Sequence, residues 1–201
     1  FCLSRGLGDV YKRQFQMRTD AMLKEEIYRE MAAQTEALLK AGFPVTHLDG
    51  HQHVHIFPAV IEVAVRIAKT FGIPWMRIPA DAPETAAPGH PADSEAGLFS
   101  ALAAAARPRV AASTVRAPDH FRGLYLKGRL TAANLQSTLA GLPDGLTELM
   151  VHPGRAPAVA QGGPFSAFST RDRETELMTL MGGAFRNALH EYGIVLTPFP
   201  R

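Results

Sequence analysis

The chain has 201 residues, of which 46% are hydrophobic, so it can bury one substantial core, and a single domain is the simplest interpretation. Its 21 basic and 19 acidic side chains nearly cancel, and no nucleic-acid motif surrounds the cations, so we expect no nucleic-acid partner. No apolar run is long enough to span a bilayer, and the single cysteine excludes an internal disulfide. We therefore expect a cytoplasmic protein without a membrane span.

Residues 1–14 fit no structural pattern. They show neither helical nor strand periodicity, and their apolar residues are too scattered for a signal peptide. Their sequence looks like the translated adapter found at the ends of some assembled reads. We expect residues 1–14 to be an adapter-derived artefact and residues 15–201 to form one domain. The only cysteine, Cys2, lies in the suspected artefact, so it then says nothing about the protein's compartment.

Helices and strands are expected to alternate along the rest of the chain. In chain order we predict a helix at 24–40, a strand at 43–48, a helix at 58–71, a strand at 73–78, a helix at 96–106 closed by Pro108, a helix after the N-cap Thr131 to 140, a strand at 146–151, a helix at 173–192 and a strand at 194–196. This order implies a largely parallel sheet with right-handed crossovers. The loops at 79–95 and 153–169 are long enough to be binding loops.

Residues 47–58 hold four of the eight histidines, which fall at odd positions around Asp49: His47, His51, His53 and His55. In an extended strand, alternate side chains point to one face, so these imidazoles and the carboxylate would converge. Neutral imidazole and carboxylate are the ligands of a borderline divalent ion such as zinc. The block follows a predicted strand, and α/β proteins place active sites at the carboxyl ends of strands. It therefore predicts a metal site.

Residues 46–58 also resemble the central signature of the YdjC-like (ChbG/HpnK) carbohydrate deacetylases. Further segments agree in order, at 76–79, 119–124, 128–130, 148–154 and 173–177. The resemblance covers about residues 17–199. It implies a metal-dependent hydrolase that removes acetyl groups from N-acetylated sugars. It also implies an α/β fold, a partial (β/α) barrel of the glycoside hydrolase/deacetylase type.

The amino-terminal part of the family's sequence pattern is missing from this chain. In the family, an aspartate and a histidine from two N-terminal segments bind the metal, together with the histidine two residues after the aspartate of the central block. Only the last is present, as His51, and the paired-aspartate strand expected to supply the catalytic base is absent. We therefore expect a truncated gene model that holds the C-terminal two thirds of the domain, lacks the first strands, and is inactive as printed.

Residue roles follow from the resemblance and from side-chain chemistry. The resemblance implies that His51 binds one divalent metal ion, magnesium or zinc. His152 is the candidate general acid that protonates the departing amine, because it follows a predicted strand end and precedes a Pro-Gly turn.

The neighbours of His51 have more than one interpretation. Asp49 either orients an imidazole or contacts a sugar hydroxyl. His53 and His55 either contact substrate, support the metal site, or are purely structural. Arg77 either binds substrate or pairs with an acidic neighbour.

The expected partner is a small-molecule carbohydrate or glycolipid, and a homodimer is compatible with the sequence. Two alternatives stay open. Asp49-x-His51-x-His53 also fits a motif of amidohydrolase-type metal-dependent barrels, although that motif belongs on a first barrel strand. The chain could instead be an inactive metal- or sugar-binding homologue, because the expected base is missing.

Overall fold

The computed structural model describes residues 21–82, 91–155 and 171–199. The suspected adapter segment, 1–14, lies outside these residues, as do parts of the two predicted long loops. The contacts divide the chain into two compact units, each assembled from separate stretches of sequence. Of the described residues, unit 1 comprises 21–80, 99–118 and 199, and unit 2 comprises 81–82, 91–98, 119–155 and 171–198.

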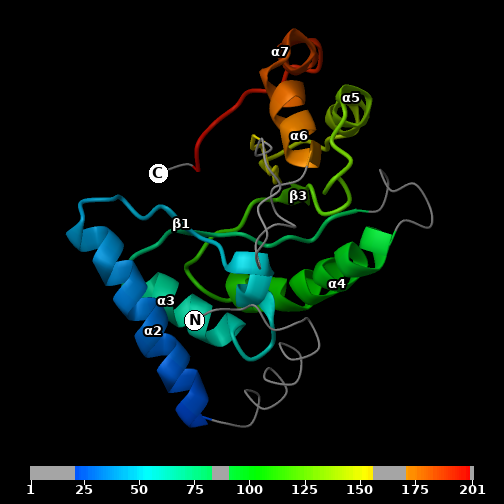
Figure 1. Cartoon of the computed structure of the whole chain (residues 1–201). Helices are drawn as coiled ribbons and strands as arrows, with labels where there is room; N and C mark the ends of the chain where they lie inside the picture. The colour runs from blue at the N-terminus through cyan, green and yellow to red at the C-terminus, as the bar shows by residue number, and fades with distance from the viewer. Residues whose placement is uncertain (1–20, 83–90, 156–170, 200–201) are drawn as a thin grey trace. The chain divides into compact units, whose positions relative to one another are not determined.

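Two predicted helices of unit 1 are confirmed and lie side by side (Figure 1). They are α2 (Ala21–Lys40) and α3 (Ile61–Thr70). The buried residues of α3 recur at helical spacing, which is why the periodic pattern predicted it: Ile61, Val63, Ala64, Ile67 and Ala68. The outer surfaces of the two helices are joined by ion pairs, such as Lys24 Nζ to Glu62 Oε2 at 2.9 Å. Exposed pairs of this kind add little stability, so the apolar face of α3 is the main source of its stability.

Unit 1 holds two short parallel strands, β1 (His47–Leu48) and β2 (Trp75–Met76). His47 pairs with Trp75 and Leu48 with Met76, and Arg116 extends the pairing on the other side of β2. Both strands were predicted, but each is shorter than expected. Because the pair is parallel, the residues that follow β1 and β2 leave the sheet at the same edge.

Helix α4 (Pro91–Ala111) is longer than the predicted helix at 96–106, and the prediction that Pro108 closes it is wrong. Proline removes one helical hydrogen bond and clashes with the preceding turn. Beyond it, however, Val110 is 1% exposed, on the same face as the buried Ala103 and Ala106. Burying a valine side chain stabilises by about 1.5–3 kcal/mol, which offsets much of the proline's cost of about 3 kcal/mol.

Unit 2 contains a second parallel pair, β3 (His120–Arg122) and β4 (Thr147–Leu149). His120 pairs with Thr147 and Arg122 with Leu149. Strand β3 was not predicted, because its three residues show no strand pattern of their own and their pairing partner is distant in sequence. The strand predicted at 194–196 is wrong. These residues form no strand in the part of the chain described, and the side chains of Val195 and Leu196 are 82% and 68% exposed.

Three further helices of unit 2 are α5 (Ala132–Ala140), α6 (Arg171–Met181) and α7 (Gly183–Glu191). The predicted N-cap is confirmed, since the side-chain oxygen of Thr131 accepts a hydrogen bond from the Asn134 amide at 3.2 Å. The single helix predicted at 173–192 is two helices, separated where Gly182 takes an extended conformation (φ −69°, ψ 151°). Glycine has a low helix propensity, and it is the residue at which the helix breaks.

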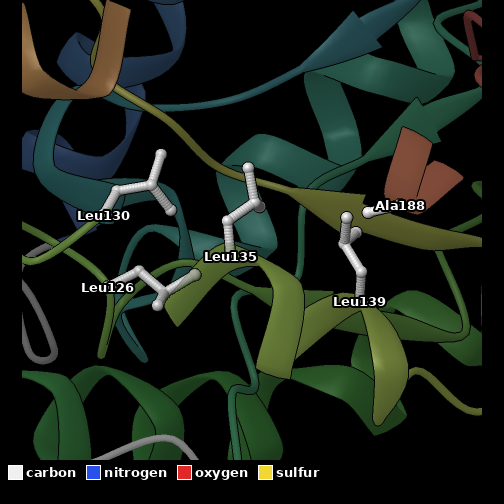
Figure 2. Packing of buried hydrophobic residues seen from close by; sticks show 5 residues of the cluster. All are labelled: Leu126, Leu130, Leu135, Leu139 and Ala188. Atoms are coloured by element: carbon white, nitrogen blue, oxygen red, sulfur yellow. The ribbon is translucent and has the colours of Figure 1, made fainter. Parts of the chain in front are cut away.

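The core of unit 2 is a cluster of leucines that lies between α5 and α7. Figure 2 shows its buried members: Leu126, Leu130, Leu135, Leu139 and Ala188. The protein is thus a mixed α/β fold with short parallel strands. None of the helices in the described residues is long and apolar enough to cross a membrane.

Candidate functional site

The histidine block does not continue β1 as an extended strand. Residues His51–Ile56 form a 3-10 helix, η1, and two residues in it adopt left-handed backbone, Gln52 (φ 49°) and His53 (φ 55°). The expectation that alternate imidazoles share one strand face is therefore wrong beyond Leu48. The His53 amide instead closes a turn by donating to the Gly50 carbonyl at 2.8 Å. A left-handed backbone conformation costs a non-glycine residue about 1–3 kcal/mol, and residues in it concentrate at functional sites.

The buried ring of His55 stabilises the turn through two hydrogen bonds. Its ring is fully buried, and Nδ1 accepts a hydrogen bond from the Gly50 amide at 3.0 Å. Nδ1 is thus the acceptor, so Nε2 carries the proton and donates to the Arg77 carbonyl at 2.8 Å. A Cβ on Gly50 would lie only 3.0 Å from His55 Nδ1, so the ring packs directly on the glycine backbone. His55 therefore ties the end of β1 to the end of β2.

Asp49 and Arg77 form an ion pair at the same sheet edge. Arg77 Nη1 donates to Asp49 Oδ2, and the Arg77 amide donates to the Leu48 carbonyl at 3.0 Å. The other oxygen, Asp49 Oδ1, lies 3.9 Å from Nδ1 of both His53 and His55. Of the two roles considered for Arg77, the structure shows pairing with an acidic neighbour. Both distances are too long for a hydrogen bond, and Nδ1 of His55 already accepts one from the Gly50 amide. The proposed role of Asp49 in orienting an imidazole therefore stays a prediction.

The remaining histidines of the block differ in exposure. His53 is 7% exposed, and its ring packs edge-on against Phe99 with centroids 5.4 Å apart. His47 is exposed, and its ring stacks on the ring of Phe199 with the centroids 4.4 Å apart. His51, the first residue of η1, is exposed. Within the turn, His51 is therefore the imidazole that a ligand can reach.

Burial lowers the pKa of His55, and the hydrogen bond to the Arg77 carbonyl opposes this only in part. A histidine whose pKa is lowered in the folded state stabilises the fold fully above its unfolded pKa of about 6.5. That contribution is lost as the pH falls through the folded pKa. The free energy of unfolding, measured with urea, should therefore fall between pH 7 and pH 5.

Replacing His55 with glutamine should reduce this pH dependence, because the variant has no group to protonate at that position. His190→Gln, at an exposed position of α7, controls for the loss of one imidazole. The same slope of stability against pH in wild type and His55→Gln would contradict the assignment of His55 as a buried neutral histidine.

A second candidate, His152, lies in unit 2 just past β4, as the sequence predicted. The last ladder bond runs from the Met150 amide to the Arg122 carbonyl at 2.8 Å. His152 is half-buried and lines a small pocket with six other residues: Gly123, Leu126, Lys127, Leu130, Met150 and Glu176. Its amide donates to the Glu176 carboxylate, and its carbonyl accepts from Arg173 Nε at 3.1 Å.

Asp81, which the sequence analysis did not select, fixes the loop beside this pocket. One carboxylate oxygen accepts hydrogen bonds from the amides of Gly123, Leu124 and Tyr125 at 3.0, 2.9 and 3.3 Å. The side chain is only 1% exposed. Burial raises the pKa of Asp81, and the hydrogen bonds from the amides of Tyr125 and Gly123 oppose the rise. The only sequence signal for this role was its position shortly after a predicted strand, and its partners are more than 40 residues away.

The described residues do not by themselves fit the implied metal ion. No group of three or more His, Cys, Asp or Glu side chains within the described ranges is arranged to hold one. Protein zinc sites use at least three such ligands. The ligand role of His51 stays a prediction.

A family model described as YdjC-like protein matches residues 3–191, and the chain belongs to that family. The match extends into the segment 1–14, whose adapter origin stays a prediction. A solved structure titled as a putative cellobiose-phosphate cleavage protein, from Enterococcus faecalis V583, shares the fold. It has a TM-score of 0.60 at 20% identity, over 88% of this chain and 60% of that one.

Several similar curated proteins are named carbohydrate deacetylase. The protein from Danio rerio is 30% identical over 87% of this chain and 65% of its own length. The protein from Mus musculus is 30% identical over 87% of this chain and 60% of its own length. The protein from Brevibacillus brevis is 26% identical over 96% of this chain and 67% of its own length. The chain thus spans roughly two thirds of the length of these relatives.

Proposed function

We propose that the protein hydrolyses the acetamido group of N-acetylated sugars, acting on a small carbohydrate or a glycolipid. Membership of the YdjC-like family and the names of the similar proteins support this activity. The observation that carries it in this chain is the turn at the carboxyl ends of β1 and β2. There, buried bonds of His55 and the Asp49–Arg77 pair hold a loop that exposes His51.

We also propose that the described strands belong to a partial (β/α) barrel. Both strand pairs are parallel, and each is followed by a candidate functional residue at its carboxyl end. In such barrels the catalytic residues come from the carboxyl ends of several different strands.

His51 and His152 have separate roles in this proposal. His51 contributes one ligand to a divalent ion, magnesium or zinc, whose other ligands come from outside the described residues. His152 protonates the departing amine, since an imidazole can donate a proton at near-neutral pH. A well-placed general acid contributes about 100-fold or more in rate.

The amidohydrolase alternative loses its geometric basis. It required the side chains of Asp49, His51 and His53 to converge through strand alternation. In the structure the backbone turns at Gln52 and His53, and the His53 ring packs against Phe99. An inactive sugar-binding homologue is distinguished by the assay that follows.

Acetate release from N-acetylglucosamine oligomers, with zinc or magnesium added, tests the proposal. The 201-residue chain as printed should release acetate at close to the background rate, because only one of the expected metal ligands and none of the expected aspartate bases is present in it. The protein expressed from the start codon of its own gene should release acetate at ordinary enzymatic rates. Full activity of the printed chain would contradict the missing-ligand argument. Sugar binding without acetate release by the gene-encoded protein would favour the inactive homologue.

A further inference from the structure

Two side chains of α6 form hydrogen bonds with both backbone polar groups of His152, its amide and its carbonyl. We infer that Glu176 and Arg173 are positioning residues, which fix His152 for the proton transfer assigned to it above. The inference rests on the proposed function, in which His152 is the general acid. Neither residue was selected from the sequence for any role in the site.

The need for such residues follows from where the sheet ends. Strand β4 ends at Leu149, and the Met150 amide makes the last bond of the ladder. Two residues later, the His152 amide donates to Glu176 and the carbonyl accepts from Arg173. Side chains of α6 thus supply the hydrogen-bond partners of the His152 backbone, as strand β3 does for the backbone of β4.

The two side chains are matched to this task. Residues three apart lie on the same face of a helix, so Arg173 and Glu176 reach the same peptide segment. One carries donors only and the other, when ionised, acceptors only, which matches the carbonyl and the amide of one residue. A third link runs from the Gly154 amide to the Arg173 carbonyl at 3.0 Å. Together these three bonds hold the turn after β4 against the start of α6.

Glu176 is buried where its neighbours on α6 are not. It is 3% exposed, whereas Glu174 is exposed. Burying a carboxylate is costly unless it is paired or hydrogen-bonded, and a backbone amide bound to an ionised acceptor makes one of the stronger hydrogen bonds in proteins. The hydrogen bond from the His152 amide therefore gives the buried carboxylate of Glu176 a structural reason.

The helix that carries the pair is itself anchored on the core of unit 2. One turn beyond Glu176, the Thr179 hydroxyl donates to the Leu130 carbonyl at 3.2 Å. Leu180 packs against the cluster that contains Leu130. A rigid support matters because misplacing a reacting group by about 1 Å can cost about 100-fold in rate.

Amide hydrogen exchange tests the positioning contact without any need for turnover. In Glu176→Leu, protection of the His152 amide should fall about tenfold or more, because a hydrogen bond to a charged group is lost. Glu176→Gln retains an acceptor oxygen and should keep most of the protection. Glu174→Gln, on the exposed side of α6, should match wild type. The Gly154 amide bonds to backbone, so its retained protection shows that α6 is still in place.

Kinetics of the protein expressed from its own gene test the consequence. Glu176→Leu should lower kcat by about 10-fold to 100-fold and change KM less than about twofold, and Glu176→Gln should recover most of kcat. Unchanged exchange at His152 in Glu176→Leu would overturn the inference, whatever the activity. Equal loss of protection at His152 and Gly154 would reduce Glu176 to a general stabiliser of α6. No acetate release by the wild-type protein would instead overturn the proposed function, while the exchange data still decide the contact.

Discussion

Replacing Gly123 with alanine should lower the free energy of unfolding by about 3–5 kcal/mol, because the substitution meets two separate penalties. Gly123 has φ +132°, a backbone conformation that side chains rarely adopt. An alanine Cβ would also lie 2.4 Å from the Met150 carbonyl oxygen and 2.9 Å from its Cβ. The carbonyl oxygen belongs to the backbone just past β4 and the Cβ is bonded directly to that backbone, so neither atom can rotate away. Urea denaturation followed by circular dichroism measures the loss.

Gly42→Ala separates the two penalties. Gly42 also has a positive φ, +83°, but nothing lies within 4 Å of the position its Cβ would take. This variant should lose only about 1–2 kcal/mol, the ordinary cost of left-handed backbone for a residue with a Cβ. Equal losses in the two variants would show that Gly123 does not approach β4 as closely as described.

Replacing His51 with alanine should abolish metal-dependent acetate release in the protein expressed from its own gene. The expected fall in activity is at least about 100-fold, since losing a residue that only supports a metal ligand already costs about 10-fold to 100-fold. Bound zinc or magnesium, measured by elemental analysis of the purified protein, should fall with it. Fold stability should change little, because His51 is exposed.

His47→Ala is the matched control for this experiment. His47 is another exposed histidine of the same block, and its ring stacks on Phe199. It should retain metal and activity. If His51→Ala kept both its metal content and its turnover, His51 would not be a ligand.

Local signals in the sequence predicted the helices well. The apolar spacing of α3 and the N-cap of α5 are set by residues within a few positions of each other. Strand β3 could not be predicted, because its pairing with β4 comes from outside the segment. Gly182 was read as part of one long helix, and its effect as a break emerged only in the structure.

The candidate site could be predicted in composition but not in geometry. The sequence located the histidine block and His152 at strand ends, and both are found there. It did not show that Gln52 and His53 turn left-handed, because only a few per cent of non-glycine residues adopt that conformation. Glu176 was missed because its partner, His152, is 24 residues away.

The proposal that this family member removes acetyl groups is tested most directly by measuring both products of the reaction. The gene-encoded protein would be incubated with N-acetylglucosamine oligomers and a divalent ion, and acetate and free amine would be measured over time. Amide hydrolysis predicts that the two appear in equal amounts, and that His51→Ala stops both. New reducing ends without acetate, or binding with neither product, would contradict the assignment.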